Sequence, residues 1–226
     1  MRKTLLLCGL ASSVLYIAAN IFVPTQFEGY DWISQTVSEL SAIGAPTRPL
    51  WIALMIPYGL LLIAFGWGVL LSAEGRRSLK IAGWLMITHG VIGFFWPPMH
   101  LRGAERSLTD TLHIVFTAVT VPLMILQIVF GAAAFGKNFR IYSGVTLAIL
   151  IAFGALTGWQ APNIATNLPT PMIGVWERVN IAAYMIWIAA FSVVLWKEAG
   201  AASSVLERPQ HLGQPTHSRP HAAGIR

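Results

Sequence analysis

Residues 111–134 read TLHIVFTAVTVPLMILQIVFGAAA and contain no Asp, Glu, Lys or Arg. A helix needs about 20 such residues to cross a bilayer core of roughly 30 Å. Five further stretches have a similar length and apolar character. The six predicted spans are approximately 4–23, 50–72, 80–97, 111–134, 141–159 and 178–196. No cleavage site of small residues ends the first stretch, so we interpret it as an uncleaved span.

The composition of the whole chain agrees with this interpretation. Of its 226 residues, 55% are hydrophobic and 11% are charged, and the mean hydropathy is +0.64. Soluble domains carry about 25% charged residues, so a soluble fold is excluded. The sequence predicts an all-α, polytopic membrane protein, with six transmembrane helices in one bundle over residues 1–197. Residues 198–226 are rich in Gly, Pro, His and Gln, which predicts a disordered cytoplasmic tail.

Lys and Arg are divided unequally between the two sides of these spans. With the N-terminus inside, eleven of them lie on the inner side and four on the outer side. Loops on the cytoplasmic side are enriched in Lys and Arg, so the sequence predicts a cytoplasmic (inner) membrane protein with both termini inside. Topology therefore explains the basic balance, and we expect no nucleic-acid partner.

The first predicted outer loop, residues 24–48, is long and polar, as functional loops often are. Its serines recur at helical spacing beside apolar residues, which predicts a short interfacial helix. Ser38, Glu39 and Arg48 are candidate ligand-binding residues of this loop. We expect Glu39 and Arg48 to pair across the turn that follows the helix. The alternative is an interfacial helix that only caps the bundle.

A polar stripe runs along one side of the predicted fourth span. At about 100° per residue, five polar residues share this side: Asp110, His113, Thr117, Thr120 and Gln127. Polar side chains in hydrocarbon face the bundle interior or a cavity, because lipid leaves them without partners. Asp110 and His113 are one turn apart and are expected to interact. The sixth span carries a similar stripe, and we expect the two stripes to face each other; its members are Glu177, Asn180 and Tyr184.

His100 lies at the outer end of the third span. With Asp110 and His113 it is a candidate for a three-ligand metal site or for an acid–base set. No His-Glu-x-x-His or His-x-x-x-His spacing is present, and Cys8 is the only cysteine. A metal site would therefore depend on proximity alone, and we expect no metal and no other cofactor.

Three segments of the chain carry a family resemblance. They are SELSAIGAPTR (38–48), TDTLH (109–113) and WERVN (176–180). In this order they resemble motifs of domain of unknown function 998, a family of multi-pass prokaryotic membrane proteins, over about residues 5–197. Where we expect Phe-Pro and an acidic residue, this chain has WPPMHLRG (96–103), so no role of that acid is carried over. The resemblance implies an architecture and no established activity.

The sequence predicts an outward-facing polar mouth formed by the first outer loop, residues 98–113 and the start of the sixth span. Its ligand-binding candidates are Ser38, Glu39, Arg48, His100, Asp110, His113, Glu177 and Asn180. The predicted function is binding or translocation of a small or lipid-headgroup ligand there. One alternative is an intramembrane hydrolase that uses the His, Asp and Glu side chains, and another is a structural partner of a further membrane protein. The expected partners are the lipid bilayer and this ligand, and the sequence assigns no oligomeric state.

Overall fold

The computed structural model describes residues 1–206, and the side chains of residues 1–201. The elements in chain order are α1 (Arg2–Phe22), η1 (Val23–Gln26), η2 (Val37–Ser41), α2 (Arg48–Leu71), α3 (Arg77–Phe94), α4 (Leu108–Ala133), α5 (Lys137–Ala165) and α6 (Ile173–Leu206). The two η elements are 3₁₀ helices. The described residues form no strand beyond one isolated bridge between Ile43 and His100. The predicted all-α class is confirmed.

Five segments are long and apolar enough to cross a membrane. They are Arg2–Gln26, Arg48–Leu71, Leu108–Ala133, Lys137–Ala165 and Ile173–Ala201. The remaining long helix, α3, has only 18 residues and carries Arg77, Lys80 and His89. The chain is thus a helical protein of the multi-pass membrane type.

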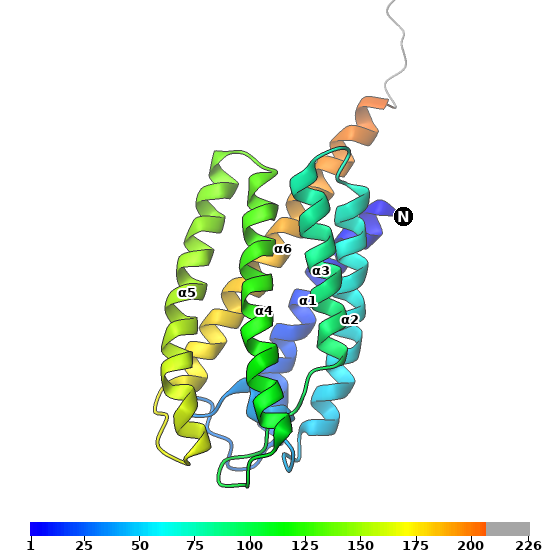
Figure 1. Ribbon diagram of the computed structural model, residues 1–226. Coiled ribbons are helices and arrows are strands. Elements are labelled where there is room, and N and C mark those ends of the chain that lie inside the picture. The colour runs from blue at the N-terminus through cyan, green and yellow to red at the C-terminus, as the bar shows by residue number, and fades with distance from the viewer. Residues whose placement is uncertain (207–226) are drawn as a thin grey trace, which may run out of the picture.

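The six α-helices close into a ring. Each helix packs against the next one along the chain, and α6 returns to pack against α1. Figure 1 shows α2 and α3 upright on one side and α5 on the other, with α1 and α6 crossing obliquely behind α4. The opposite end to the N-terminus, which we call the distal end, carries residues 27–47, 95–107 and 166–172. Three segments far apart in the sequence therefore meet at one end.

Glycines hold α2 and α3 close together. A Cβ atom on Gly66 would lie 2.8 Å from the carbonyl oxygen of Gly83, and the Gly90–Gly59 approach is similarly tight at 3.0 Å. Small residues let helix backbones approach in this way. In α5, a Cβ on Gly154 would lie 3.0 Å from Asn180 Nδ2, whereas a Cβ on Gly158 would meet nothing within 4 Å.

Apolar side chains fill the middle of the ring. Leu6, Phe65 and Trp187 are fully buried in the larger cluster, and the rings of Trp187 and Phe191 stack with centroids 4.9 Å apart. A smaller cluster at the distal end joins α1 and α2 to the 27–47 loop through Val37, Leu40 and Trp51. The loop is therefore anchored by its own apolar residues as well as by polar contacts.

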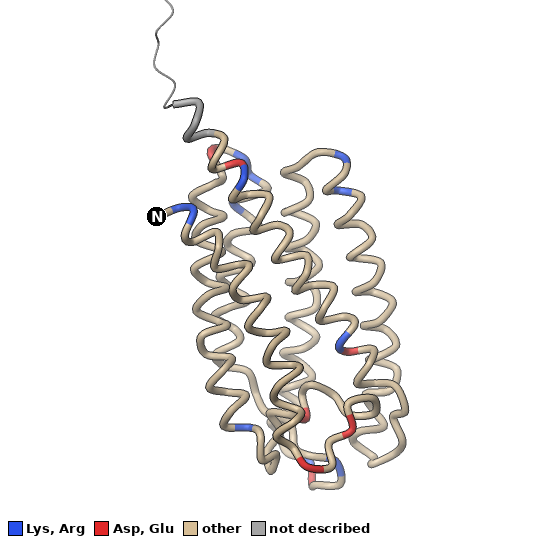
Figure 2. The backbone as a smooth tube through the Cα atoms, turned by 180° about the vertical axis from the view of Figure 1, so that it is seen from behind, with Lys and Arg blue, Asp and Glu red and all other residues tan. Residues whose placement is uncertain are grey.

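Charged residues concentrate at the two ends of the bundle. Figure 2 shows Lys and Arg gathered mainly at the end that holds the N-terminus and most Asp and Glu at the distal end. The tail predicted at residues 198–226 lies outside the described residues from 207 onward. Its first residues, up to Leu206, continue α6.

We predict that Gly83→Ala lowers the free energy of unfolding by about 1–3 kcal/mol, because the added methyl group forces α2 and α3 apart. The new Cβ would lie 2.8 Å from the Leu70 side chain and 2.9 Å from the Gly66 carbonyl oxygen. Gly93→Ala in the same helix is the matched control, since nothing lies within 4 Å of that position. Thermal unfolding in detergent measures both variants. An equal loss of Tm in the two would contradict this packing.

Candidate functional site

Two adjacent charged residues of α6, Glu177 and Arg178, hold the 27–47 loop at the distal end. The Glu177 carboxylate accepts hydrogen bonds from the backbone N–H of Val37 at 2.5 Å and from the Ser38 hydroxyl at 3.4 Å. Val37 is the first residue of η2. The first N–H groups of a helix have no partner within it. Glu177 supplies that partner from a segment 140 positions away.

Arg178 binds the same loop through its carbonyl groups. Its guanidinium donates to the carbonyl oxygens of Trp32 at 3.0 Å and Gln35 at 3.1 Å, and to the Tyr30 hydroxyl at 2.6 Å. It also lies 4.5 Å from the centre of the Trp32 ring, a cation–π contact. Arg178 is only 7% exposed and forms no salt bridge among the described residues. Carbonyl dipoles and aromatic faces therefore stabilise this buried cation.

The start of α6 approaches the loop so closely that only glycine fits. A Cβ on Gly174 would lie 2.5 Å from the carbonyl oxygen of Trp32. The backbone N–H of Gly174 donates to the Ile33 carbonyl at 2.9 Å. On the loop side, the Tyr30 hydroxyl donates to the Thr36 carbonyl at 2.7 Å. Burial raises the pKa of Tyr30, so this hydroxyl keeps the proton that it donates.

Glu39 and Arg102 form an ion pair at the core of this end. Glu39 is fully buried, and its carboxylate accepts from Arg102 Nε at 2.6 Å and Nη2 at 3.1 Å. The carboxylate also accepts from the Thr36 backbone N–H at 2.7 Å and closes a capping box on η2. Arg102 donates in addition to the Ser34 carbonyl at 2.7 Å. The pair thus fastens the 95–107 connection to the 27–47 loop.

The predicted pairing of Glu39 with Arg48 is wrong. Arg48 donates instead to the Ser41 carbonyl at 3.0 Å, at the C-terminal end of η2. Neighbouring Thr47 donates to the Leu40 carbonyl at 2.8 Å. Both residues therefore supply partners for the last carbonyl groups of a short helix, which lack partners within it.

Asp110 joins the start of α4 to the connection that precedes it. Its Oδ1 accepts from the His100 backbone N–H at 2.7 Å, and its Oδ2 accepts from the Ser107 N–H at 2.9 Å. His100 Nδ1 lies 2.8 Å from Oδ2. In the neutral ring, a carboxylate partner at Nδ1 favours the tautomer with the proton on Nδ1, in which Nε2 is an acceptor. Nε2 has no hydrogen-bond partner among the described residues, and the His100 side chain is 22% exposed.

His113 is turned toward the end of α3. Its Nδ1 lies 2.8 Å from the Pro97 carbonyl oxygen and 3.2 Å from Trp96 Nε1. The Asp110 carboxylate does not orient the His113 ring as predicted, because no hydrogen bond joins the two among the described residues, although its charge still acts on the ring. Asp110 is the third residue of α4, and a carboxylate at this position bends back to cap its own helix. In the described part of the chain, no group of three or more His, Cys, Asp or Glu side chains could hold a metal ion.

The stripe on α4 is buried except at one position. Asp110, His113, Thr120 and Gln127 are buried, whereas Thr117 is exposed. The predicted stripes of α4 and α6 meet at Gln127, the stripe residue of α4 farthest from the distal end, where the Tyr184 hydroxyl donates to Gln127 Oε1. Gln127 Nε2 lies 3.2 Å from the Leu85 carbonyl and 3.3 Å from His89 Nδ1. Asn180 faces elsewhere, because its Nδ2 donates to the Leu150 carbonyl of α5 at 2.7 Å.

Two arginines of this end were not among the predicted site residues. Arg102 pairs with a residue 63 positions away, and no local pattern in the sequence indicates such a partner. Arg178 could have been identified, because an arginine near the start of a predicted span requires partners that offset the cost of burying its charge. The structure brings seven of the eight candidates into contacts with the loops at the distal end. They are Ser38, Glu39, Arg48, His100, Asp110, His113 and Glu177.

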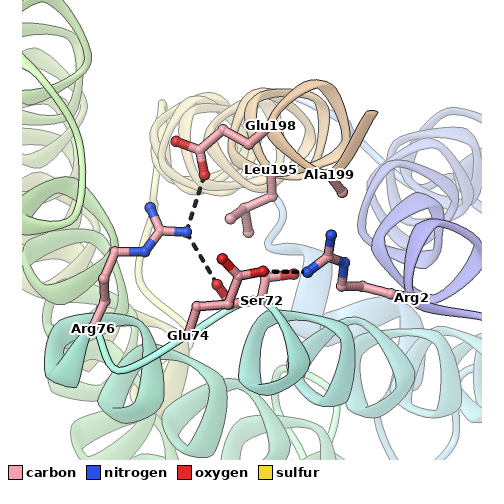
Figure 3. Close-up of a pocket in the computed structure, with 7 residues that line it drawn as sticks. All are labelled: Arg2, Ser72, Glu74, Arg76, Leu195, Glu198 and Ala199. Atoms are coloured by element: carbon pink, nitrogen blue, oxygen red, sulfur yellow. Dashed lines mark hydrogen bonds and ion pairs between the residues drawn. The ribbon is translucent and has the colours of Figure 1, made fainter. Parts of the chain in front are cut away.

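A second group of charges lies at the end that holds the N-terminus. Figure 3 shows a small open recess there, lined by Arg2, Ser72, Glu74, Arg76, Leu195, Glu198 and Ala199. Arg2 pairs with Glu74 at 2.5 Å and Arg76 with Glu198 at 3.1 Å. These side chains are 30–61% exposed. Exposed ion pairs contribute about 0–1 kcal/mol each to the free energy of unfolding, so these two pairs join helix ends but stabilise the protein only slightly.

The chain matches the family model described as Protein of unknown function (DUF998) over residues 10–194. No curated protein and no solved structure is significantly similar to it. The matched range contains all the distal-end residues described above.

We predict that Arg102→Ala lowers the free energy of unfolding by about 3 kcal/mol, because the buried Glu39 carboxylate loses its counter-charge. Arg106→Ala is the matched control, since Arg106 lies in the same connection and is exposed. Thermal unfolding of the purified variants in detergent measures the difference. The ion pair has no such role if Arg102→Ala unfolds at the same temperature as Arg106→Ala.

Proposed function

The chain belongs to the family Protein of unknown function (DUF998), and from this premise we propose that it is a six-span protein of the cytoplasmic membrane. We further propose that its outer end binds a small molecule or a lipid headgroup. The observation that carries the binding site is the His100 ring, held by Asp110 at the distal end, whose Nε2 has no partner among residues 1–201.

The sixth span of this proposal is α3. Its 18 residues extend for about 27 Å at 1.5 Å per residue. Figure 1 shows that α2 ends at the N-terminal end of the bundle and that α4 begins at the distal end. The chain between them has to cross the full length of the bundle, and α3 makes this crossing. Its Arg77 and Lys80 lie at the end where Lys and Arg gather.

The distribution of charge supports an inside location for the N-terminus. Among the described residues, four Lys or Arg lie at the distal end: Arg48, Arg102, Arg106 and Arg178. The others lie near the N-terminal end, which is the pattern of a cytoplasmic side. The distal end is then the outer end, and η2 with its loop lies at the outer surface of the membrane.

The chemistry of His100 defines the ligand class. With Nδ1 protonated toward Asp110, Nε2 accepts a hydrogen bond from a hydroxyl or an ammonium group. The six acidic residues of this end outnumber its four arginines, which favours a ligand that donates hydrogen bonds. Binding is favoured over translocation, because the Gln127 amide at the inner end of the stripe is fully buried and already has partners.

An intramembrane hydrolase is the second candidate function. The same geometry favours it, since a carboxylate that orients an imidazole can make it a general base toward water. Two of the predicted members of that set are occupied elsewhere, because Glu39 pairs with Arg102 and His113 contacts Pro97. The hydrolase would thus depend on His100 and Asp110 alone.

We predict that a cysteine at Ser78 is protected from a membrane-impermeant maleimide added to intact cells. The variant is made in a Cys8→Ser background, since Cys8 is the only cysteine. Glu105→Cys in the 95–107 connection is the matched control and should react, because Glu105 is exposed at the distal end. Reaction at position 78 but not at position 105 would reverse the orientation.

We predict that phosphatidylethanolamine and phosphatidylglycerol raise the Tm of the detergent-purified protein more than phosphatidylcholine does, because the choline headgroup has no hydrogen-bond donor. A bound headgroup at about 100 times its Kd stabilises a protein by about 2.7 kcal/mol. His100→Gln should abolish the difference between the lipids, while Glu105→Gln should retain it. Equal lipid effects in wild type and His100→Gln would exclude His100 as the binding residue.

A further inference from the structure

Backbone polar groups of the 27–47 loop have hydrogen-bond partners within the protein. Five consecutive carbonyl groups, those of residues 32–36, accept hydrogen bonds. Their donors are Arg178 for Trp32 and Gln35, the Gly174 N–H for Ile33, Arg102 and Thr170 for Ser34, and Tyr30 for Thr36. Water satisfies such groups in an ordinary surface loop. This loop instead takes its donors from two arginines, a tyrosine and the start of α6.

Several N–H groups of the loop also have hydrogen-bond partners within the protein. Asp31 N–H donates to Gln35 Oε1 at 2.7 Å, and Ile33 N–H donates to Asp31 Oδ1 at 3.0 Å. The next residues, Thr36 and Val37, donate to Glu39 and Glu177. Irregular backbone is tolerated at membrane depth only when the protein supplies its hydrogen-bond partners. The carbonyl groups of residues 32–36 and the N–H groups of Asp31, Ile33, Thr36 and Val37 meet this condition.

Apolar side chains project outward from this backbone. Trp32 is 45% exposed and Ile33 is 49% exposed, although each lies in a loop. The 166–172 connection runs beside them, since Thr170 Oγ1 donates to the Ser34 carbonyl at 2.7 Å (Figure 1). It adds Leu168 at 53% and Met172 at 40% exposure. We call these four residues the loop patch.

The loop patch continues the surface of the bundle that would face lipid. At the distal end of α5, which leads into the 166–172 connection, Trp159 is 74% exposed. Further along α5, Leu156 and Ile151 are also exposed. Tryptophan at the end of a span is typical of the membrane–water interface. The patch therefore extends an apolar surface beyond the helices and onto the loops.

We propose that the loop patch inserts into the headgroup–acyl boundary of the outer leaflet, so that a lipid surface is the partner of this loop. The proposal rests on the outward orientation of the distal end. Apolar and aromatic side chains that lie in this layer anchor peripheral segments by the area they bury. Trp32 stacks on Arg178 below it, and insertion would therefore hold the whole distal network against the membrane.

Asp31 sets the depth of this insertion. It is exposed at the tip of the loop, and its carboxylate accepts hydrogen bonds from the Ser34 hydroxyl and the Ile33 N–H. The Ser34 hydroxyl is the main cause that lowers the pKa of Asp31, so the group stays charged at neutral pH. A carboxylate in this state remains among headgroups and water. The loop then lies at the boundary and does not enter the hydrocarbon core.

The test measures which reagent reaches a spin label on the patch. Ile33→Cys and Met172→Cys are made separately in the Cys8→Ser background, labelled with a nitroxide, and reconstituted in vesicles of phosphatidylethanolamine and phosphatidylglycerol. Collisions with molecular oxygen report lipid, and collisions with a nickel chelate report water. Glu105→Cys is the aqueous control and Ile151→Cys, 60% exposed on α5, is the lipid control.

The expected ratio of oxygen to nickel accessibility at positions 33 and 172 is several-fold higher than at position 105 and below that at position 151. A ratio equal to that at position 105 would overturn the proposal, because the patch would face water. Low accessibility to both reagents would also overturn it, because a protein surface or a second copy would then cover the patch. Failure of the proposed orientation is distinguishable, because maleimide labelling at positions 78 and 105 in intact cells measures the orientation separately. Headgroup binding at His100 is tested separately by Tm.

Discussion

Opposite charges on two adjacent residues of α6 organise the distal end of the bundle. Glu177 accepts from the first N–H group of η2 and from the Ser38 hydroxyl, and Arg178 donates to carbonyl groups of the turn that precedes η2. α6 therefore binds both N–H and C=O groups of the loop backbone, and these contacts fix the position of the loop on α6. That position buries Glu39, and the buried Glu39 requires Arg102. Arg102 in turn anchors the 95–107 connection, which carries His100 to Asp110.

The burial of charged side chains at the distal end has an energetic cost, which hydrogen bonds close to each charge offset. Burying a carboxylate or a guanidinium costs several kcal/mol unless each receives hydrogen bonds. Glu39 accepts from Arg102 and Thr36, and the two terminal nitrogens of Arg178 donate to carbonyl groups and to the Tyr30 hydroxyl, whereas its buried Nε has no partner among the described residues. Because Arg102 and Arg178 belong to other segments than the loop they bind, a substitution at either arginine releases a segment far away in the sequence. The distal end thus behaves as one unit.

The polar residues deeper in the bundle act differently. Gln127, His89 and Tyr184 come from α4, α3 and α6 and contact one another in the middle of the ring. Interhelical hydrogen bonds of this kind hold transmembrane helices together. At the distal end, by contrast, His100 presents a nitrogen without a partner among the described residues. The proposed ligand site and the proposed lipid-inserted loop therefore both lie where the network meets its surroundings.

The sequence by itself determined the helical class, the approximate extent of the spans and the three polar segments that form the distal end. The length and periodicity of hydrophobic stretches are local properties of the sequence, and they do not depend on how the helices pack. The sequence also identified Glu39, His100, Asp110 and Glu177 as candidates, because charged or ionisable groups next to apolar spans require partners. Only the tertiary structure decided which partners they have: Arg102 for Glu39 in place of Arg48, and His100 for Asp110 in place of His113. These pairings depend on how loops that are distant in the sequence fold over the helix ends. The spacing of residues along the chain does not predict which of them come together.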